Sequence, residues 1–129
     1  MKFIKSDISS TLSVMRSELT EQEAQWAVAV GLVLRKTRKQ AGLAQEEVAY
    51  KAGTGRLTMQ RIEYGSTSPN LVTLLRVCSA LDLPPSMLFG EVEMLIKHPS
   101  QLEAAIAARA SELPPSRARA RKATHTTPR

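Results

Sequence analysis

The sequence predicts an all-α fold, and two observations indicate it. Apolar residues recur at the three- and four-residue spacing of helices, and no segment shows the alternating pattern of a strand. The apolar content is 43% and the aromatic content only 4%, which suits a helical core built from Leu, Val, Ile and Ala. The 129 residues suffice for one domain with extensions, because about 60 residues already make a small core.

The first expected helices lie in an N-terminal arm, residues 1–24, and at the start of the domain that follows. The arm helix is short and amphipathic, and it is predicted from four apolar residues at helical spacing: Ile8, Leu12, Met15 and Leu19. Thr20 and Glu23 have the spacing of a capping box, in which each side chain binds the other residue's backbone N–H. The first domain helix is therefore expected to begin there and to run to about Gln40.

Two short helices joined by a glycine are predicted next. The first has an apolar face made of Val48, Ala49 and Ala52. Gly53 ends it, because glycine accepts left-handed backbone at little steric cost. The second turns two apolar residues inward, and its outward face carries the side chains of Arg56, Leu57, Gln60 and Arg61. Two helices in this arrangement form a helix-turn-helix, which indicates nucleic-acid binding.

Three further helices are expected towards the C-terminus. Asn70 is a good cap for a fourth helix, and Leu83-Pro84-Pro85 leads into a short fifth helix that ends at Phe89. Residues 25–90 would then form the domain. A last helix, from about residue 100 to 112, is predicted in a C-terminal extension over residues 91–113, because its apolar residues keep helical spacing: Leu102, Ala105, Ile106, Ala110 and Leu113.

The single cysteine, Cys78, excludes a disulfide within the chain. It falls on the apolar side of the fourth helix, whose stripe is Leu71, Leu74, Leu75, Cys78 and Leu81. A small, buried core residue is therefore the interpretation that we favour over a reactive thiol.

Positive charge is concentrated in two parts of the chain. The net charge is +6, with +4 in residues 25–90 and +5 in the tail 114–129, while the other parts are negative. The tail has no apolar periodicity and begins at Pro114-Pro115, so we predict that it is disordered. Its cations are Arg117, Arg119, Arg121, Lys122 and Arg129. Such a distribution is typical of a protein that binds phosphates. A solubility function or a docking arm for a protein partner remains open for the tail.

The pattern over residues 31–89 resembles the phage repressor/Cro family of helix-turn-helix domains, also called the xenobiotic-response-element type. The matching residues are Leu34-Arg35 with Arg38, Gly42-Leu43-Ala44-Gln45, Val48-Ala49, Gly53, Met59 with Ile62-Glu63-Tyr64-Gly65, and Pro69 with Thr73-Leu74. Three residues depart from the family pattern: Ala44 and Gly55, where the family prefers a Ser or Thr cap, and Asp82, where Gly is usual.

The resemblance implies a site on double-stranded DNA. It places the third helix of the domain in the major groove, where base edges would be contacted by Arg56, Leu57, Gln60 and Arg61. Phosphate contacts would come from Gln45 and, as weaker candidates, from Thr58, Tyr64, Ser66 and Thr67. Arg38 and Glu63 match a family pair that bridges the first and third helices, so we interpret them as structural.

The expected function is sequence-specific regulation of transcription, most simply repression, by a homodimer, because one recognition helix reads only a few base pairs. Two alternatives remain open: an antitoxin-type protein that neutralises a toxin and regulates its own genes, and a coactivator that docks on the transcription machinery. No enzyme, cofactor or metal is expected, since His98 and His125 are isolated from other ligands. The longest apolar run, Trp26–Leu34, is shorter than the ~20 residues of a membrane span, and the N-terminus does not resemble a signal peptide, so a cytoplasmic protein is expected.

Overall fold

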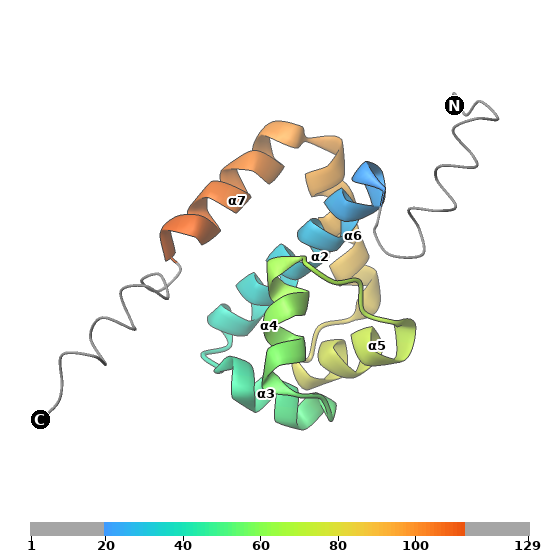
Figure 1. Ribbon diagram of the computed structural model, residues 1–129, viewed down its shortest axis with the longest axis vertical. Coiled ribbons are helices and arrows are strands. Elements are labelled where there is room, and N and C mark those ends of the chain that lie inside the picture. The colour runs from blue at the N-terminus through green and yellow to red at the C-terminus, as the bar shows by residue number, and fades with distance from the viewer. Residues whose placement is uncertain (1–19, 113–129) are drawn as a thin grey trace, which may run out of the picture.

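The computed structural model describes residues 20–112, and within that range the chain forms six helices (Figure 1). The expected arm helix around residues 8–19 and the tail 114–129 lie outside the described residues. The helices are α2 (Glu21–Gln40), α3 (Gln45–Ala52), α4 (Arg56–Tyr64), α5 (Leu71–Ala80), α6 (Pro85–Lys97) and α7 (Pro99–Glu112). The predicted all-α fold is confirmed.

Helix α2 is the central element, and α4 and α6 pack against it. It begins at the predicted capping box: Thr20 Oγ1 accepts the Glu23 N–H at 3.2 Å, and Glu23 Oε1 accepts the Thr20 N–H at 3.1 Å. Gly31 lies where α2 crosses α4. A β-carbon there would come within 2.4 Å of the Ile62 carbonyl oxygen, so the crossing depends on the absence of a side chain.

Helices α3 and α4 form the predicted helix-turn-helix. Gly53 ends α3 with a φ of 71°, in the left-handed region expected for it. Ala44 supplies no capping oxygen at the start of α3, but its N–H donates to Glu47 Oε1 at 2.7 Å, which satisfies one backbone group. The apolar face of α3 is buried as predicted: Val48, Ala49 and Ala52.

Helix α5 begins at Asn70, whose side chain accepts the Thr73 N–H at 2.8 Å. Asp82 follows its end with a φ of 58°, in place of the usual glycine. The predicted apolar stripe is only partly correct. Cys78 is buried with Leu74, Val77 and Leu81, whereas Leu71 and Leu75 are 65% and 41% exposed. Leu71 is the first residue of the helix, and Leu75 is turned about 100° away from Leu74, so neither faces the core.

Helix α6 is longer than predicted. It continues past Phe89 to Lys97, because Leu88 and Val92 both bury their side chains in the core and Gly90 does not interrupt the helix. The expected division between residues 90 and 91 thus falls inside a helix. Helix α7 then packs Leu102 against the same core, together with the partly buried Ala105 and Ile106.

Within residues 20–112, no single helix is long and apolar enough to cross a membrane. Helices α5 and α6 reach that length together, but they are bent by 105° at their junction. Their inward-facing residues belong to the core of the helical domain, as Val77 and Val92 illustrate.

Candidate nucleic-acid interface

Helix α4 has two contrasting faces. Met59 and Ile62 are 0% and 1% exposed and hold the helix against the core. The opposite face carries exposed side chains, including the large apolar Leu57, which is 55% exposed: Arg56, Leu57, Gln60 and Arg61. The four residues predicted to contact bases therefore share one exposed face, and burial of the other face fixes the direction in which they point.

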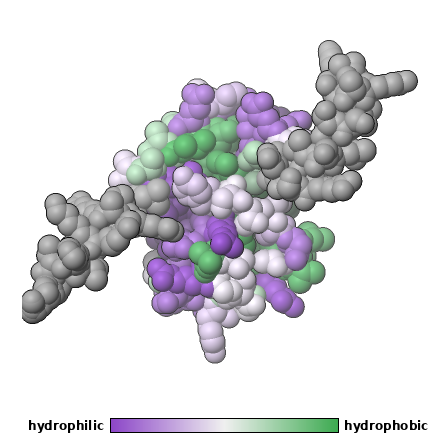
Figure 2. Space-filling view, in the orientation of Figure 1, coloured by the Kyte–Doolittle hydropathy of each residue, from purple (hydrophilic) through white to green (hydrophobic). Residues whose placement is uncertain are grey.

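This face of α4 lines an open concavity of about 970 Å³ between α2, α3, α4 and the end of α7. Six cationic side chains and three carboxylates line it, so the surface is net positive. The cations are Arg35, Arg38, Lys39, Arg56, Arg61 and Arg109. In Figure 2, hydrophilic residues cover much of the surface over α3 and α4, while a hydrophobic area lies over α7. The concavity therefore has the positive charge and the exposed side chains that binding of a polyanion requires.

A buried carboxylate holds the end of α4 against α2. Glu63 is 2% exposed, and its oxygens accept from Arg38 Nε at 2.6 Å and Arg38 Nη2 at 3.0 Å. The same carboxylate accepts from Gln45 Nε2 at 3.0 Å and lies 3.9 Å from Arg35 Nη1. Arg38 also donates to the Leu43 carbonyl at 2.7 Å. The residues interpreted as a structural pair thus belong to a network that joins α2, α3 and α4.

The residues predicted to contact phosphates are dispersed. Gln45, Tyr64 and Ser66 line the concavity, whereas Thr58 and Thr67 do not. Gln45 lies at the start of α3, but its amide nitrogen already donates to Glu63, so part of its hydrogen-bonding capacity serves the interhelical network. The role of these five residues in contacting DNA stays a prediction.

Arg109 on α7 contacts the last carbonyl groups of α4, a role that the sequence pattern did not reveal. Its Nη1 donates to the Tyr64 carbonyl at 3.0 Å and to the Glu63 carbonyl at 3.3 Å, and its guanidinium carbon lies 4.4 Å from the centre of the Tyr64 ring. The last carbonyls of a helix lack partners within it and carry partial negative charge. Arg109 therefore caps the C-terminus of α4.

Glu112, the last described residue, links α7 to α2. Its Oε1 accepts from Arg35 Nη2 at 3.3 Å and from Lys39 Nζ at 3.5 Å. The hydrogen bond from Arg35 and the charge of Lys39 lower the pKa of the Glu112 carboxyl from its ordinary value. Arg35 could have been expected here, because Arg35 and Arg38 are three residues apart on one helix and so share a face. No local pattern points to Arg109 or Glu112.

His98, the histidine within residues 20–112, follows the last residue of α6. His98 Nδ1 lies 2.9 Å from the Met94 carbonyl oxygen at the end of α6. No group of three His, Cys, Asp or Glu side chains within residues 20–112 is arranged to hold a metal ion.

Comparisons with known proteins agree with this geometry. A family model described as a helix-turn-helix domain matches residues 29–88. An uncharacterized HTH-type transcriptional regulator of Methanothermobacter thermautotrophicus (strain ATCC 29096 / DSM 1053 / JCM 10044 / NBRC 100330 / Delta H) is 41% identical over 49 residues, which are 38% of this chain and 71% of that protein.

Two solved structures are also similar. A point mutant of the restriction-modification controller protein C.Esp1396I is 27% identical with a TM-score of 0.53, over 57% of this chain and 96% of that one. The controller protein C.AhdI from Aeromonas hydrophila is 35% identical with a TM-score of 0.47, over 48% of this chain and 94% of that one.

The similarity to the curated regulator extends over most of that protein, and the helix pair α3 and α4 lies inside the matched range. The chain therefore belongs to the Cro/C1-type helix-turn-helix family of DNA-binding transcription regulators.

Proposed function

We propose that this protein represses transcription by binding a specific DNA site as a homodimer, with α4 in the major groove. The observation that carries this proposal is the exposed face of α4, where two arginines, a glutamine and a leucine project from a helix fixed by burial and by the Glu63 network. Arginine matches the two acceptors of guanine, and Leu57 matches the methyl group of thymine.

The test begins with selection of bound sequences from random or genomic DNA by the full chain. Binding of Arg56→Ala and Arg61→Ala to the selected site and to random DNA is then measured by fluorescence anisotropy. Each variant should lose about 1–3 kcal/mol on the selected site and much less on random DNA. Arg76→Ala is the control, because Arg76 is an exposed cation of α5 that does not line the concavity. Equal losses on both DNAs would reduce Arg56 and Arg61 to phosphate contacts.

The homodimer is supported by symmetry and by exposed apolar surface. One nine-residue helix reads few base pairs, and two copies on a two-fold axis double the contact. Large apolar side chains are exposed on α5 and early in α6: Leu71, Val72, Leu75, Met87 and Phe89. Sedimentation of the full chain should give a dimer, and Phe89→Glu should weaken it more than Tyr50→Glu, a change at an exposed residue of α3. A monomeric full chain at micromolar concentration would contradict this part of the proposal.

A second candidate is control of a restriction-modification system, because the structure with a TM-score of 0.53 is a controller protein of such a system. Neighbouring genes for a restriction enzyme and a methyltransferase, with binding to their promoter, would favour this function. A neighbouring toxin gene would favour the antitoxin alternative instead. Binding to a protein of the transcription machinery without salt-dependent binding to DNA would favour the coactivator. A promoter fused to a reporter gives the sign of regulation.

A further inference from the structure

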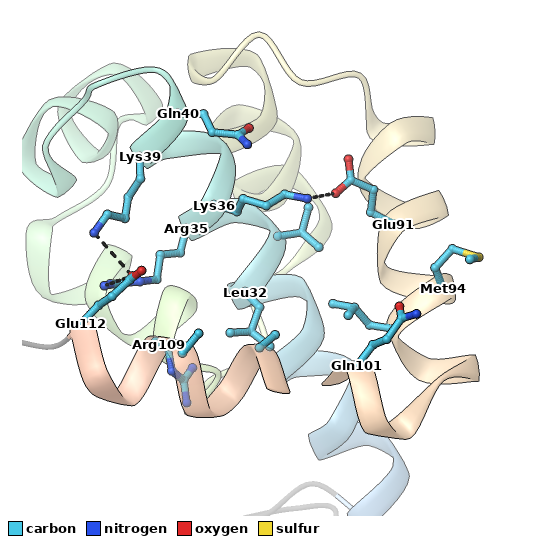
Figure 3. Close-up of a pocket in the computed structure, with 14 residues that line it drawn as sticks. Leu32, Arg35, Lys36, Lys39, Gln40, Glu91, Met94, Gln101, Arg109 and Glu112 are labelled. Atoms are coloured by element: carbon cyan, nitrogen blue, oxygen red, sulfur yellow. Dashed lines mark hydrogen bonds and ion pairs between the residues drawn. The ribbon is translucent and has the colours of Figure 1, made fainter. Parts of the chain in front are cut away.

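A second hollow lies between α2, α6 and α7 (Figure 3). It adjoins the concavity beside α4, because the same four side chains line both: Arg35, Lys39, Arg109 and Glu112. It is a groove of about 570 Å³, within the range of sites for small organic ligands. Its apolar lining comes from all three helices: Leu32, Val33, Met94, Leu95, Ala105 and Ala108. An apolar groove of this size would favour a ligand with a hydrocarbon part.

Charged groups gather along one side of this groove. Lys36 Nζ lies 2.7 Å from Glu91 Oε1, so these two charges neutralise each other across α2 and α6. Arg35 and Lys39, in contrast, share the carboxylate of Glu112, at 3.3 and 3.5 Å (Figure 3). Arg35 also lies 3.9 Å from Glu63, a carboxylate that Arg38 binds more closely. This end of the groove therefore has a surplus of positive charge, and it already binds one carboxylate.

We propose that this groove binds an amphipathic carboxylate, with its hydrocarbon part on the apolar lining and its head group at Arg35 and Lys39. The head group is chosen by charge complementarity, because Arg35 and Lys39 already bind one exposed carboxylate, that of Glu112, and the carboxylate of a ligand can take its place. The hydrocarbon part follows from the apolar side chains that line the groove. The ligand competes with Glu112 for the same two cations, which links its binding to the attachment of α7.

Competition with Glu112 has a consequence for α4. Helix α7 carries both Glu112, which is attached to α2, and Arg109, which caps the carbonyls of Glu63 and Tyr64. Arg109 is 9% exposed, and its Nε atom has no hydrogen-bond partner among the described residues, so its position depends on the packing of α7. A ligand that detaches the end of α7 therefore removes the cap of α4.

Binding is tested on the full chain without DNA. Octanoate and octanol are titrated into ¹⁵N-labelled protein, and amide shifts locate the site and give the Kd. Octanoate should saturate shifts in α2, α6 and α7, and octanol should bind about tenfold more weakly, because it has no charge to offer the two cations. The absence of saturable octanoate binding, or shifts confined to other helices, would overturn the proposal, whatever else covers the groove.

Matched variants separate the two halves of the site. Ala108→Phe fills the groove and should abolish octanoate binding. Ala104→Phe, at another exposed position of α7 that does not line the groove, should leave octanoate binding unchanged. Lys39→Gln should weaken octanoate roughly threefold to fivefold and leave octanol unchanged. Glu112→Gln should tighten octanoate binding, because it removes the competing carboxylate. Weaker binding to the Glu112 variant would overturn the competition.

The link to DNA rests on the proposed function and is tested separately. Saturating octanoate should weaken binding of the wild-type chain to its selected site severalfold, and it should have no effect on Ala108→Phe. Octanoate binding with unchanged DNA affinity would overturn the link while leaving the site in place. A chain that binds octanoate but no DNA would refute the proposed function instead.

Discussion

Replacement of Glu63 by alanine should destabilise the fold more than any other single loss of charge in the described structure. The carboxylate is 2% exposed and compensates the guanidinium groups of Arg38 and Arg35, whose side chains are only 11% and 12% exposed. Glu63→Ala should lower the free energy of unfolding by about 3–5 kcal/mol, because it leaves buried cations without a compensating charge. A domain of this size has a total stability of about 5–15 kcal/mol, so the loss would be a large fraction of it.

The reverse change, Arg38→Ala, should cost less, because Glu63 keeps its hydrogen bond from Gln45 and its approach to Arg35. Glu63→Gln keeps the side-chain volume and loses the charge. Its free energy of unfolding should therefore lie between that of the parent and that of Glu63→Ala. The double variant of Arg38 and Glu63 should lose less than the sum of the single losses, by about 1–3 kcal/mol.

Urea unfolding followed by circular dichroism gives these free energies, provided that the transition is two-state. Glu103→Ala is the control, since Glu103 is an exposed glutamate of α7 outside the network. If Glu63→Ala unfolds within about 1 kcal/mol of the parent, the reasoning from burial is refuted. Parent-like stability with loss of the preferred DNA site would instead make Glu63 a residue of recognition.

Three other predictions concern packing and titration. In urea unfolding, Gly31→Ala should lower the free energy of unfolding by about 3 kcal/mol or more, because the new methyl group meets backbone atoms of α4. Gly90→Ala should raise it by up to about 1 kcal/mol, because the space around Gly90 is open. Cys78 should resist alkylation in the native protein and react after unfolding, because it is 2% exposed and burial raises the pKa of its thiol. The carboxyl of Glu112 has a pKa below its usual value of 4.5, so its ion pairs stabilise the fold fully above pH 4.5 and lose this effect as the pH falls through the lowered pKa. An NMR pH titration should show the change in the signals of α7, and Glu112→Gln should abolish this change.

Features that depend on neighbouring residues could be predicted from the sequence. The capping box at Thr20, the left-handed Gly53 and the Asn70 cap each follow from residues within four positions, and the structure has all three. The inward face of α4 also follows from helical spacing, since Met59 and Ile62 are three residues apart. In each case the physical cause is local, so a short segment of sequence contains it.

Features that depend on distant contacts could not be predicted. The fifth helix is predicted to end at Phe89, but Val92 has a place in the core that keeps α6 helical to Lys97. Arg109 contacts residues 45 and 46 positions away, and nothing near it in the sequence indicates the carbonyls that it caps.

The orientation of α4 depends on contacts of two origins. A nine-residue helix is unstable by itself, so its direction must come from packing. Gly31 allows the backbone of α4 to lie close to α2, and Arg38 binds Glu63 at the end of α4. Both contacts lie within residues 29–88, which match the family model. Arg109 lies outside that range and reaches the free end of the same helix. The shared domain therefore fixes where α4 lies, and α7 adds, from outside the matched range, the contact of Arg109 with the last carbonyls of that helix.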